Sequence, residues 1–290
     1  MVAQLIVKIR AGRLLWLFLA TALAGCASVA APSPELSPNA SADACCNNVE
    51  TAPSWFVRAL DPAAPLVGSI VAHVTWRKGY LHGETEVMET LLDELRPLDI
   101  VLVTNKGRMS NISLPGYFVH AAVYLGDERE LRRAGVWDDR AVEPYHSDVR
   151  AGKRFIEADS RGVHLSPPRV TLNVDRVVVV RPRGLSAKRR REALSDFFAS
   201  VGSRFDFRFD AETPECFFCI ELVQRIVPEI DLPLREAYGR KVLVTDDLAH
   251  AAANGYPSAS FVVYIRGDRD GWEQATREDL RRDLANNWTH

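Results

Sequence analysis

Hydrophobic and polar positions recur along this chain with two different periods, which predict a mixture of helices and strands. Apolar residues at helical spacing predict helices over residues 84–95, 186–200, 217–228 and 245–254. Short apolar or alternating runs predict strands over residues 99–103, 117–125, 155–158, 176–180 and 260–265. Because most of these strands are not separated by helices, we expect the α+β class rather than a doubly wound α/β sheet.

The first 26 residues carry a different pattern, which is typical of a secretory signal. Three basic residues are followed by an apolar run from Leu14 to Ala24. That run is too short to span a bilayer, which needs about 20 residues, but it suits the apolar part of a signal peptide. It ends in Leu23-Ala24-Gly25-Cys26, which resembles a bacterial lipobox and implies cleavage before Cys26 and acylation of its thiol. The alternative is an ordinary signal peptide with an incidental cysteine.

Changes of composition divide the chain into three predicted parts. Residues 1–25 are the predicted lipoprotein signal peptide. Residues 26–53 are rich in Ala, Ser, Pro and Asn without an apolar period, and we expect a lipidated flexible tether. Residues 54–290 are predicted to form the folded domain. We therefore expect a protein of the cell envelope, anchored by lipid to a membrane, with the outer membrane favoured, and facing the periplasm.

The overall composition excludes several classes of protein. A hydrophobic fraction of 47% over 290 residues is enough for a sizeable core. The net charge is −2, and without residues 1–25, which hold three basic and no acidic residues, it becomes −2 − 3 = −5. Such a chain lacks the basic field that nucleic-acid binding needs. Five cysteines are too few for a disulfide scaffold, and we expect a monomer.

The strongest candidate for chemistry is Cys219. The positive end of a helix stabilises a thiolate in its first turn, so a helix that begins at 217–219 would activate this residue. The segment 213–216, which itself looks like a helix start, must then be a separate turn. The alternative is a buried core cysteine, because Cys219 shares a helical face with Val223 and Val227.

Two further side chains have the chemistry to activate a thiol. Alternation in the strand 117–125 puts His120 on one face with Phe118 and Ala122, where an imidazole can act as a general base. Glu157, in another predicted strand, can accept a hydrogen bond from the far imidazole nitrogen and orient the ring. The alternatives are a hydrogen-bonded core histidine and a solvated glutamate. We expect loops or exposed helix positions for the histidines at 73, 82, 146, 164, 250 and 290.

The order of these motifs resembles a known family. The matching segments are Asp99-Ile-Val-Leu, His120-Ala-x-Val-Tyr-x-Gly126, Ile156-Glu157-Ala158 and Cys219-x-Glu221-Leu222-Val223. Over roughly residues 95–265 the chain resembles the permuted papain-like cysteine hydrolases of the NlpC superfamily, YiiX/YebB-like group. The resemblance implies a circularly permuted papain-like fold, with a small antiparallel β-barrel or sheet packed against the cysteine-bearing helix. It also implies Cys219 as nucleophile, His120 as base and Glu157 as orienting acid, without a cofactor or a metal.

The chain departs from the family pattern at three places. Ile220 follows the cysteine, where the family often has Ser or Thr, and Phe205 stands where a Tyr usually precedes Asp206. The segment 127–154 is longer than a simple connection between the His and Glu strands, and it is a candidate cover for the cleft.

Cys216 and Cys219 form a C-x-x-C, which leaves other chemistries open. A thioredoxin-like redox site is expected near a βαβ pattern, which we do not find, and a zinc site needs a second pair of ligands. Cys216 could also form a disulfide with Cys219, which would silence the nucleophile, or with Cys45 or Cys46.

The sequence therefore predicts a lipid-anchored cysteine hydrolase of the cell envelope that cleaves an amide bond, and the superfamily favours peptidoglycan stem peptides. The same architecture resembles lecithin:retinol acyltransferase-like enzymes, so a lipid acyl hydrolase or acyltransferase is one alternative. A non-catalytic envelope-binding lipoprotein is the other. A triad requires the thiol within about 4 Å of one His120 nitrogen and a Glu157 oxygen within about 3.2 Å of the other. The thiol should also open onto a groove.

Overall fold

The computed structural model describes residues 46, 49–50, 52–213 and 215–288, which belong to one unit of the chain, residues 42–290. The predicted signal peptide, the predicted acylation site Cys26 and most of the predicted tether lie outside the described residues. No helix within the described ranges is long and apolar enough to cross a membrane.

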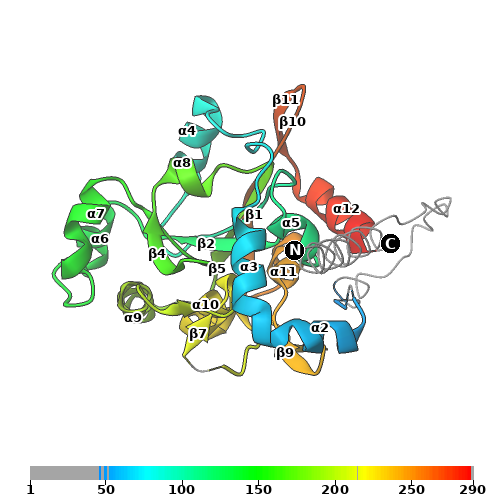
Figure 1. Ribbon diagram of the computed structural model, residues 1–290. Coiled ribbons are helices and arrows are strands. Elements are labelled where there is room, and N and C mark those ends of the chain that lie inside the picture. Colours follow the sequence, from blue (N-terminus) through cyan, green and yellow to red (C-terminus); the bar gives the residue numbers. More distant parts are fainter. Residues whose placement is uncertain (1–45, 47–48, 51, 214, 289–290) are drawn as a thin grey trace, which may run out of the picture. The chain divides into compact units, whose positions relative to one another are not determined.

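A seven-stranded sheet forms the centre of this unit (Figure 1). Its strands run in the order β11-β10-β5-β1-β2-β3-β4, and every neighbouring pair is antiparallel. The sheet ends at β11 and β4, so it is open, and the barrel that we considered is not formed. Its members are β1 (Ile100–Thr104), β2 (His120–Tyr124), β3 (Phe155–Asp159), β4 (Gly162–Ser166), β5 (Arg176–Pro182), β10 (Ala259–Asp268) and β11 (Gly271–Ala275).

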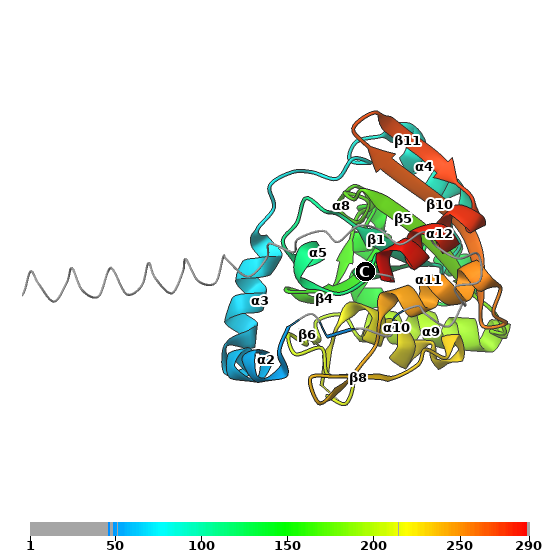
Figure 2. The same ribbon diagram turned by 90° about the vertical axis from the view of Figure 1, so that its right-hand side faces the viewer.

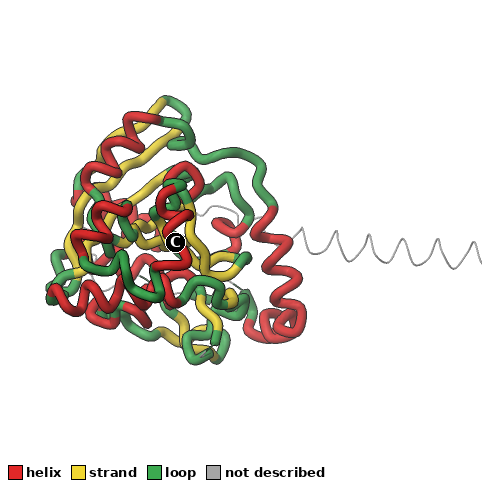
Figure 3. Tube along the Cα trace, turned by 90° about the vertical axis from the view of Figure 1, so that its left-hand side faces the viewer, coloured by secondary structure: helices red, strands yellow, loops and turns green. Residues whose placement is uncertain are grey.

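Helices cover both faces of the sheet, which confirms the α+β expectation (Figures 2 and 3). One face packs against α4 (Thr85–Glu94), and the other against α9 (Ala187–Ala199), α10 (Cys219–Ile226) and α11 (Thr245–Asn254). Alternation along β1 sends Leu102 to the α10 side and Val101 and Val103 to the α4 side. Burial on both faces explains why β1 and β5 are apolar throughout.

The remaining elements are short and lie around this core. Two small sheets pair β6 (Arg204–Phe205) with β7 (Cys216–Phe217) and β8 (Arg235–Ala237) with β9 (Arg240–Val242). The other α-helices are α2 (Ser54–Leu60), α3 (Ala64–His73), α5 (Ser110–Ser113), α6 (Glu128–Ala134), α7 (His146–Arg150), α8 (Pro168–Thr171) and α12 (Arg277–Trp288).

The predicted strand 117–125 begins later than expected. The backbone N–H groups of Tyr117 and Phe118 donate to the Asp246 carboxylate, at 2.6 and 2.8 Å, instead of pairing with a strand. Consequently β2 starts at His120, and Phe118 packs in the core on the α10 side, whereas Ala122 lies on the α4 side. The prediction that Phe118 and His120 share a strand face is therefore wrong.

The end of the predicted tether contacts the folded unit. Cys46 and Val49 are buried in a small cluster with Ala237 and Val244, beside the β8–β9 hairpin. Tyr238 donates its backbone N–H to the Glu50 carboxylate at 2.6 Å. The described residues before α2 thus pack against the hairpin.

Candidate active site

Cys219 is the first residue of α10. Cys216 and Phe217 form the short strand β7 directly before it. The helix therefore begins at Cys219, within the predicted range of 217–219. The first N–H groups of a helix lack partners within the helix, and its dipole favours negative charge there. Cys219 therefore lies at the positive end of the α10 dipole.

Glu221 fixes the start of α10. Its carboxylate accepts a hydrogen bond from the backbone N–H of Phe218 at 3.2 Å and forms an ion pair with Arg225 at 2.5 Å. The first contact is half of a capping box, in which the third helical residue closes the end of the helix. The Glu of the Cys-x-Glu motif thus has a structural role.

His120 and Glu157 lie on adjacent strands of the sheet. The register pairs Ala122 with Glu157, so His120, two residues earlier on β2, is a diagonal neighbour of Glu157 on the same face. His120 Nε2 and Glu157 Oε2 are 2.7 Å apart, which is within the predicted 3.2 Å.

Cys219 is the second hydrogen-bond partner of the His120 side chain. Because Nε2 faces Glu157, Nδ1 is the nitrogen left for the thiol. Helix α10 contacts β2 and β3, and the bond between Cys219 and His120 joins its first residue to the two strands that carry histidine and glutamate. The structure therefore juxtaposes all three residues that the sequence singled out.

The charges of this cluster reinforce one another. Burial acts to lower the pKa of His120, but the hydrogen bonds with Cys219 and Glu157 outweigh it and raise that pKa above its usual value. Burial acts to raise the pKa of Glu157, but the hydrogen bond from His120 outweighs it and lowers that pKa. An imidazolium and a carboxylate are thus favoured together at neutral pH.

The exposure of the site is uneven. Cys219 is 6% exposed, because the first turn of α10 is packed into the core. The His120 side chain is 25% exposed and that of Glu157 is 6% exposed. The expectation of a thiol that opens onto a groove is therefore not met in this conformation, and the site faces solvent through the imidazole.

A second histidine contacts Glu157 from the other side. His164 is paired with Glu157 in the register of β3 and β4, and its Nε2 lies 3.7 Å from Glu157 Oε1. Ser166 is a further side-chain hydrogen-bond partner of Glu157. The expectation that His164 occupies a loop or helix is therefore wrong. Its position between the buried Val163 and Leu165 is the alternating signal that could have revealed the strand.

Two buried aspartates hold the backbone around the site. Asp246, in the first turn of α11, bonds the backbone immediately before β2 and accepts a third hydrogen bond, from Trp288 Nε1, at 2.7 Å. Asp206 accepts N–H bonds from Arg208 and Asp210, at 2.8 and 2.7 Å, and shapes the loop that leads to β7. Sequence reasoning missed Asp246, because its bonds to Tyr117 and Phe118 span 129 and 128 positions of the chain.

Cys216 does not form a disulfide. Both Cys216 and Cys219 have free thiols, which excludes the bridges considered for Cys216 in this structure. Cys46 is disulfide-bonded. In the described part of the chain, no group of three or more His, Cys, Asp or Glu side chains could hold a metal ion.

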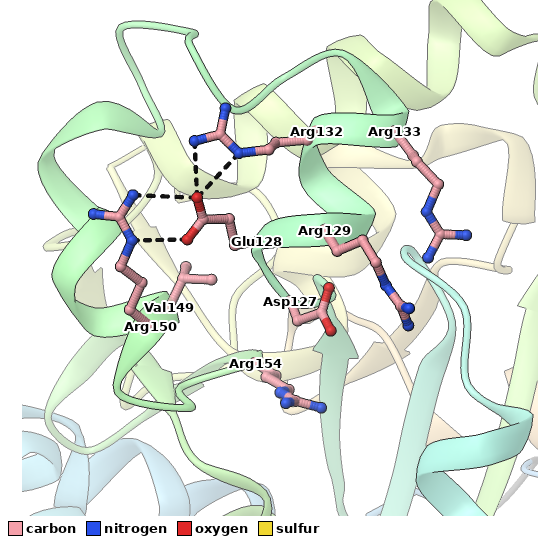
Figure 4. A pocket seen from close by; sticks show the side chains of 8 residues that line it. All are labelled: Asp127, Glu128, Arg129, Arg132, Arg133, Val149, Arg150 and Arg154. Atoms are coloured by element: carbon pink, nitrogen blue, oxygen red, sulfur yellow. Dashed lines mark hydrogen bonds and ion pairs between the residues drawn. The ribbon is translucent and has the colours of Figure 1, made fainter.

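The long connection 127–154 folds away from His120. It leaves the sheet after Tyr124, at the opposite end of β2, which is about 13 Å long at 3.3 Å per residue. The expectation that it covers the cleft is therefore not supported. Figure 4 shows the hollow that it forms, where Glu128 bonds both Arg132 and Arg150. Its volume is about 760 Å³, and the five arginines that line it are Arg129, Arg132, Arg133, Arg150 and Arg154.

An antiparallel sheet that carries a histidine and a glutamate beside a cysteine at a helix start is consistent with the papain-like class of thiol hydrolases. A sequence profile described as "Permuted papain-like amidase enzyme, YaeF/YiiX, C92 family" matches residues 94–274. The chain belongs to this family, and the match includes Cys219, His120 and Glu157. No curated protein and no solved structure matches the chain.

Proposed function

We propose that this protein is a lipid-anchored cysteine amidase of the cell envelope. Family membership supports the hydrolysis of an amide bond. The observation that carries the proposal is the linked arrangement of Cys219, His120 and Glu157. The cysteine begins a helix and bonds the imidazole, whose other nitrogen lies 2.7 Å from the carboxylate.

The arrangement supports a two-step acyl transfer. The Cys219 sulfur attacks the amide carbonyl carbon, and the backbone N–H of Cys219 donates to the oxyanion that forms. His120 then protonates the leaving nitrogen as the C–N bond breaks, which leaves a thioester on Cys219. His120 next takes a proton from water, the hydroxide attacks the thioester, and the thiol is regenerated as the acid leaves. Glu157 orients the ring and stabilises the imidazolium.

The proposed substrate is a peptide amide of the cell wall, with peptidoglycan stem peptides favoured. The resemblance to the NlpC superfamily supports the substrate class, and the lipobox-like sequence before Cys26 supports an envelope location. Acyl chains on Cys26 would hold the protein at a membrane surface, and the predicted orientation favours the periplasmic leaflet of the outer membrane.

Single substitutions of the three residues test the proposal on a cell-wall digest, with a phospholipid panel in parallel. We expect Cys219→Ala and His120→Ala each to lower turnover of the stem peptides by roughly 10³-fold or more, and Glu157→Gln to leave partial activity. Cys216→Ala is the matched control, because this neighbouring free thiol should be dispensable. A Cys219→Ala protein that keeps its activity contradicts the proposal. Release of acyl chains from phospholipid without cleavage of the stem peptides would contradict the amidase proposal in favour of a lipid acyl hydrolase.

A further inference from the structure

Helices α2 and α3 present an unusually apolar surface to solvent. Over residues 54–73 the ionisable side chains are those of Arg58, Asp61 and His73. No residue of α3 is buried, although the helix is mostly apolar. Exposed apolar patches of this kind mark interaction sites. The α2–α3 apolar surface consists of Trp55, Phe56, Leu60, Leu66, Val67 and Ile70.

Leu66 and Ile70 of α3 point away from the domain. Gly68 is the contact on the inner side, because a Cβ at this position would lie 2.5 Å from the Phe207 ring. Leu66 and Ile70 are two residues before and after Gly68, which places both on the opposite side of a helix with 3.6 residues per turn. Accordingly, they are 66% and 58% exposed.

We propose that the α2–α3 apolar surface docks onto a phospholipid bilayer. This inference rests on the proposed acylation of Cys26. Twenty positions separate Cys26 from Cys46, and a chain of that length spans at most about 70 Å. The membrane that holds the acyl chains therefore stays within reach of this surface. Trp and Phe beside aliphatic side chains are the composition of helices that insert at the headgroup level.

Aromatic contacts connect the α2–α3 apolar surface to the cysteine-bearing helix. Phe207, under Gly68, lies 5.0 Å from Phe205 between ring centroids. Phe205 lies 5.8 Å from Phe209, which in turn lies 5.4 Å from Phe218, the residue directly before α10. Docking would thus hold the start of α10 in a fixed orientation to the bilayer and favour amide substrates presented close to its surface.

Quenching of tryptophan fluorescence by brominated lipid tests the proposal. The full lipoprotein is reconstituted into phosphatidylethanolamine–phosphatidylglycerol vesicles with and without bromine on the acyl chains. Trp55 is 72% exposed in the α2–α3 apolar surface, so we expect clear quenching of the wild type and less in Trp55→Phe. Leu66→Ser/Ile70→Ser should reduce quenching at least twofold. Val170→Ser, an exposed apolar position on α8, is the matched control and should behave as wild type.

The outcomes separate docking from anchoring and from catalysis. Wild-type quenching that Leu66→Ser/Ile70→Ser does not reduce overturns the proposal. If mass spectrometry shows that Cys26 is acylated but no quenching occurs, the docking proposal is overturned and the anchoring proposal is not. Cross-linked dimers in that case would show that the surface contacts a second copy of the chain. Unacylated Cys26 without quenching overturns anchoring as well. Hydrolysis of a soluble peptide by the double variant at the wild-type rate, together with its lost quenching, supports docking as a function distinct from catalysis.

Discussion

At the residue scale, Cys219 and then Glu157 favour the charged form of His120 against the effect of burial, and the Glu157 contact has a defined geometry. The carboxylate lies 2.7 Å from Nε2 and is itself buried, so little solvent screens the interaction. The pKa of His120 is raised in the folded protein, so this group contributes stability that is present below its ordinary pKa and is lost as pH rises through the folded value. The imidazolium that would protonate the leaving group in the proposed mechanism is lost over the same alkaline range.

Glu157→Gln should therefore narrow the pH range of activity from the alkaline side. Without the carboxylate the pKa of His120 falls, by ~1–3 units for the loss of a close opposite charge. We expect the alkaline limb of kcat/KM to move to lower pH by about that amount, measured on a stem-peptide substrate. Glu143→Gln, at an exposed position in the 127–154 connection, should leave the profile unchanged. An alkaline limb that does not move in Glu157→Gln would contradict the orienting role.

The residues of the site differ in how far the sequence reveals them. Cys219, His120 and Glu157 are found because each sits in a local motif and the motifs follow one another in the family order. His164 and Asp246 have no such motif. The first acquires its place from the pairing of β3 with β4, and the second from the packing of α11 against the chain before β2. Neither contact is encoded by local spacing.

At the scale of elements, the start of α10 contains an acid that burial makes costly to ionise. Burial raises the pKa of Glu221 to about 7, against the opposing effects of the Phe218 N–H and Arg225. A carboxyl group whose folded pKa lies above its unfolded value contributes stability at low pH, and this contribution is lost as pH rises through the folded value.

Glu221→Gln should remove this dependence, because glutamine can still accept from the Phe218 N–H without ionising. Between pH 4.5 and about 7 the wild type should lose up to about 3 kcal/mol of unfolding free energy relative to the variant. Urea unfolding at pH 5 and pH 8 measures the difference. Glu215→Gln, on an exposed glutamate close to the same helix, is the control, and parallel pH curves for Glu221→Gln and wild type would refute the prediction.

Helix α11 positions β2 through one carboxylate. In Asp246→Asn an amide group replaces one of the oxygens that accept from Tyr117, Phe118 and Trp288, which should cost about 1.5–3 kcal/mol. We expect a lower Tm and, well below it, a kcat that falls more than KM changes, because His120 follows two residues later. Asp99→Asn is the matched control, since it weakens a buried ion pair with Arg181 away from the site. An equal loss of kcat in both variants would contradict a specific role of Asp246 in positioning His120 and would leave it a role in overall stability.

Elements with a strong apolar period were predictable, and those defined by tertiary contacts were not. Helix α9 begins after Ser186, whose hydroxyl accepts from the Arg189 N–H at 3.1 Å, and its buried face follows the helical spacing. Helix α12, in contrast, buries little beyond Leu280 and Leu284, so its charged sequence carries no comparable period. The helices of the 127–154 connection are too short for a period to appear.

At the scale of the whole molecule, Cys26→Ser tests the proposed attachment to the membrane. Without the thiol, acylation cannot occur, so labelling with a clickable fatty acid should disappear from the protein. Cys216→Ser, which removes a thiol in the folded unit, should keep full labelling. A Cys26→Ser protein that is still labelled would show that the lipobox interpretation is wrong.

The order of the site residues along the chain determines when the site can exist. His120 and Glu157 are 37 positions apart, and Cys219 follows 219 − 157 = 62 positions later. Contacts across such separations form only when long loops close, late in folding. A chain that is synthesised from its N-terminus therefore contains His120 and Glu157 before it contains Cys219. In the complete but unfolded chain, the Cys219 thiol is not in contact with His120. The reactivity proposed for Cys219 is thus withheld during synthesis, and it arises only when α10 docks on the sheet.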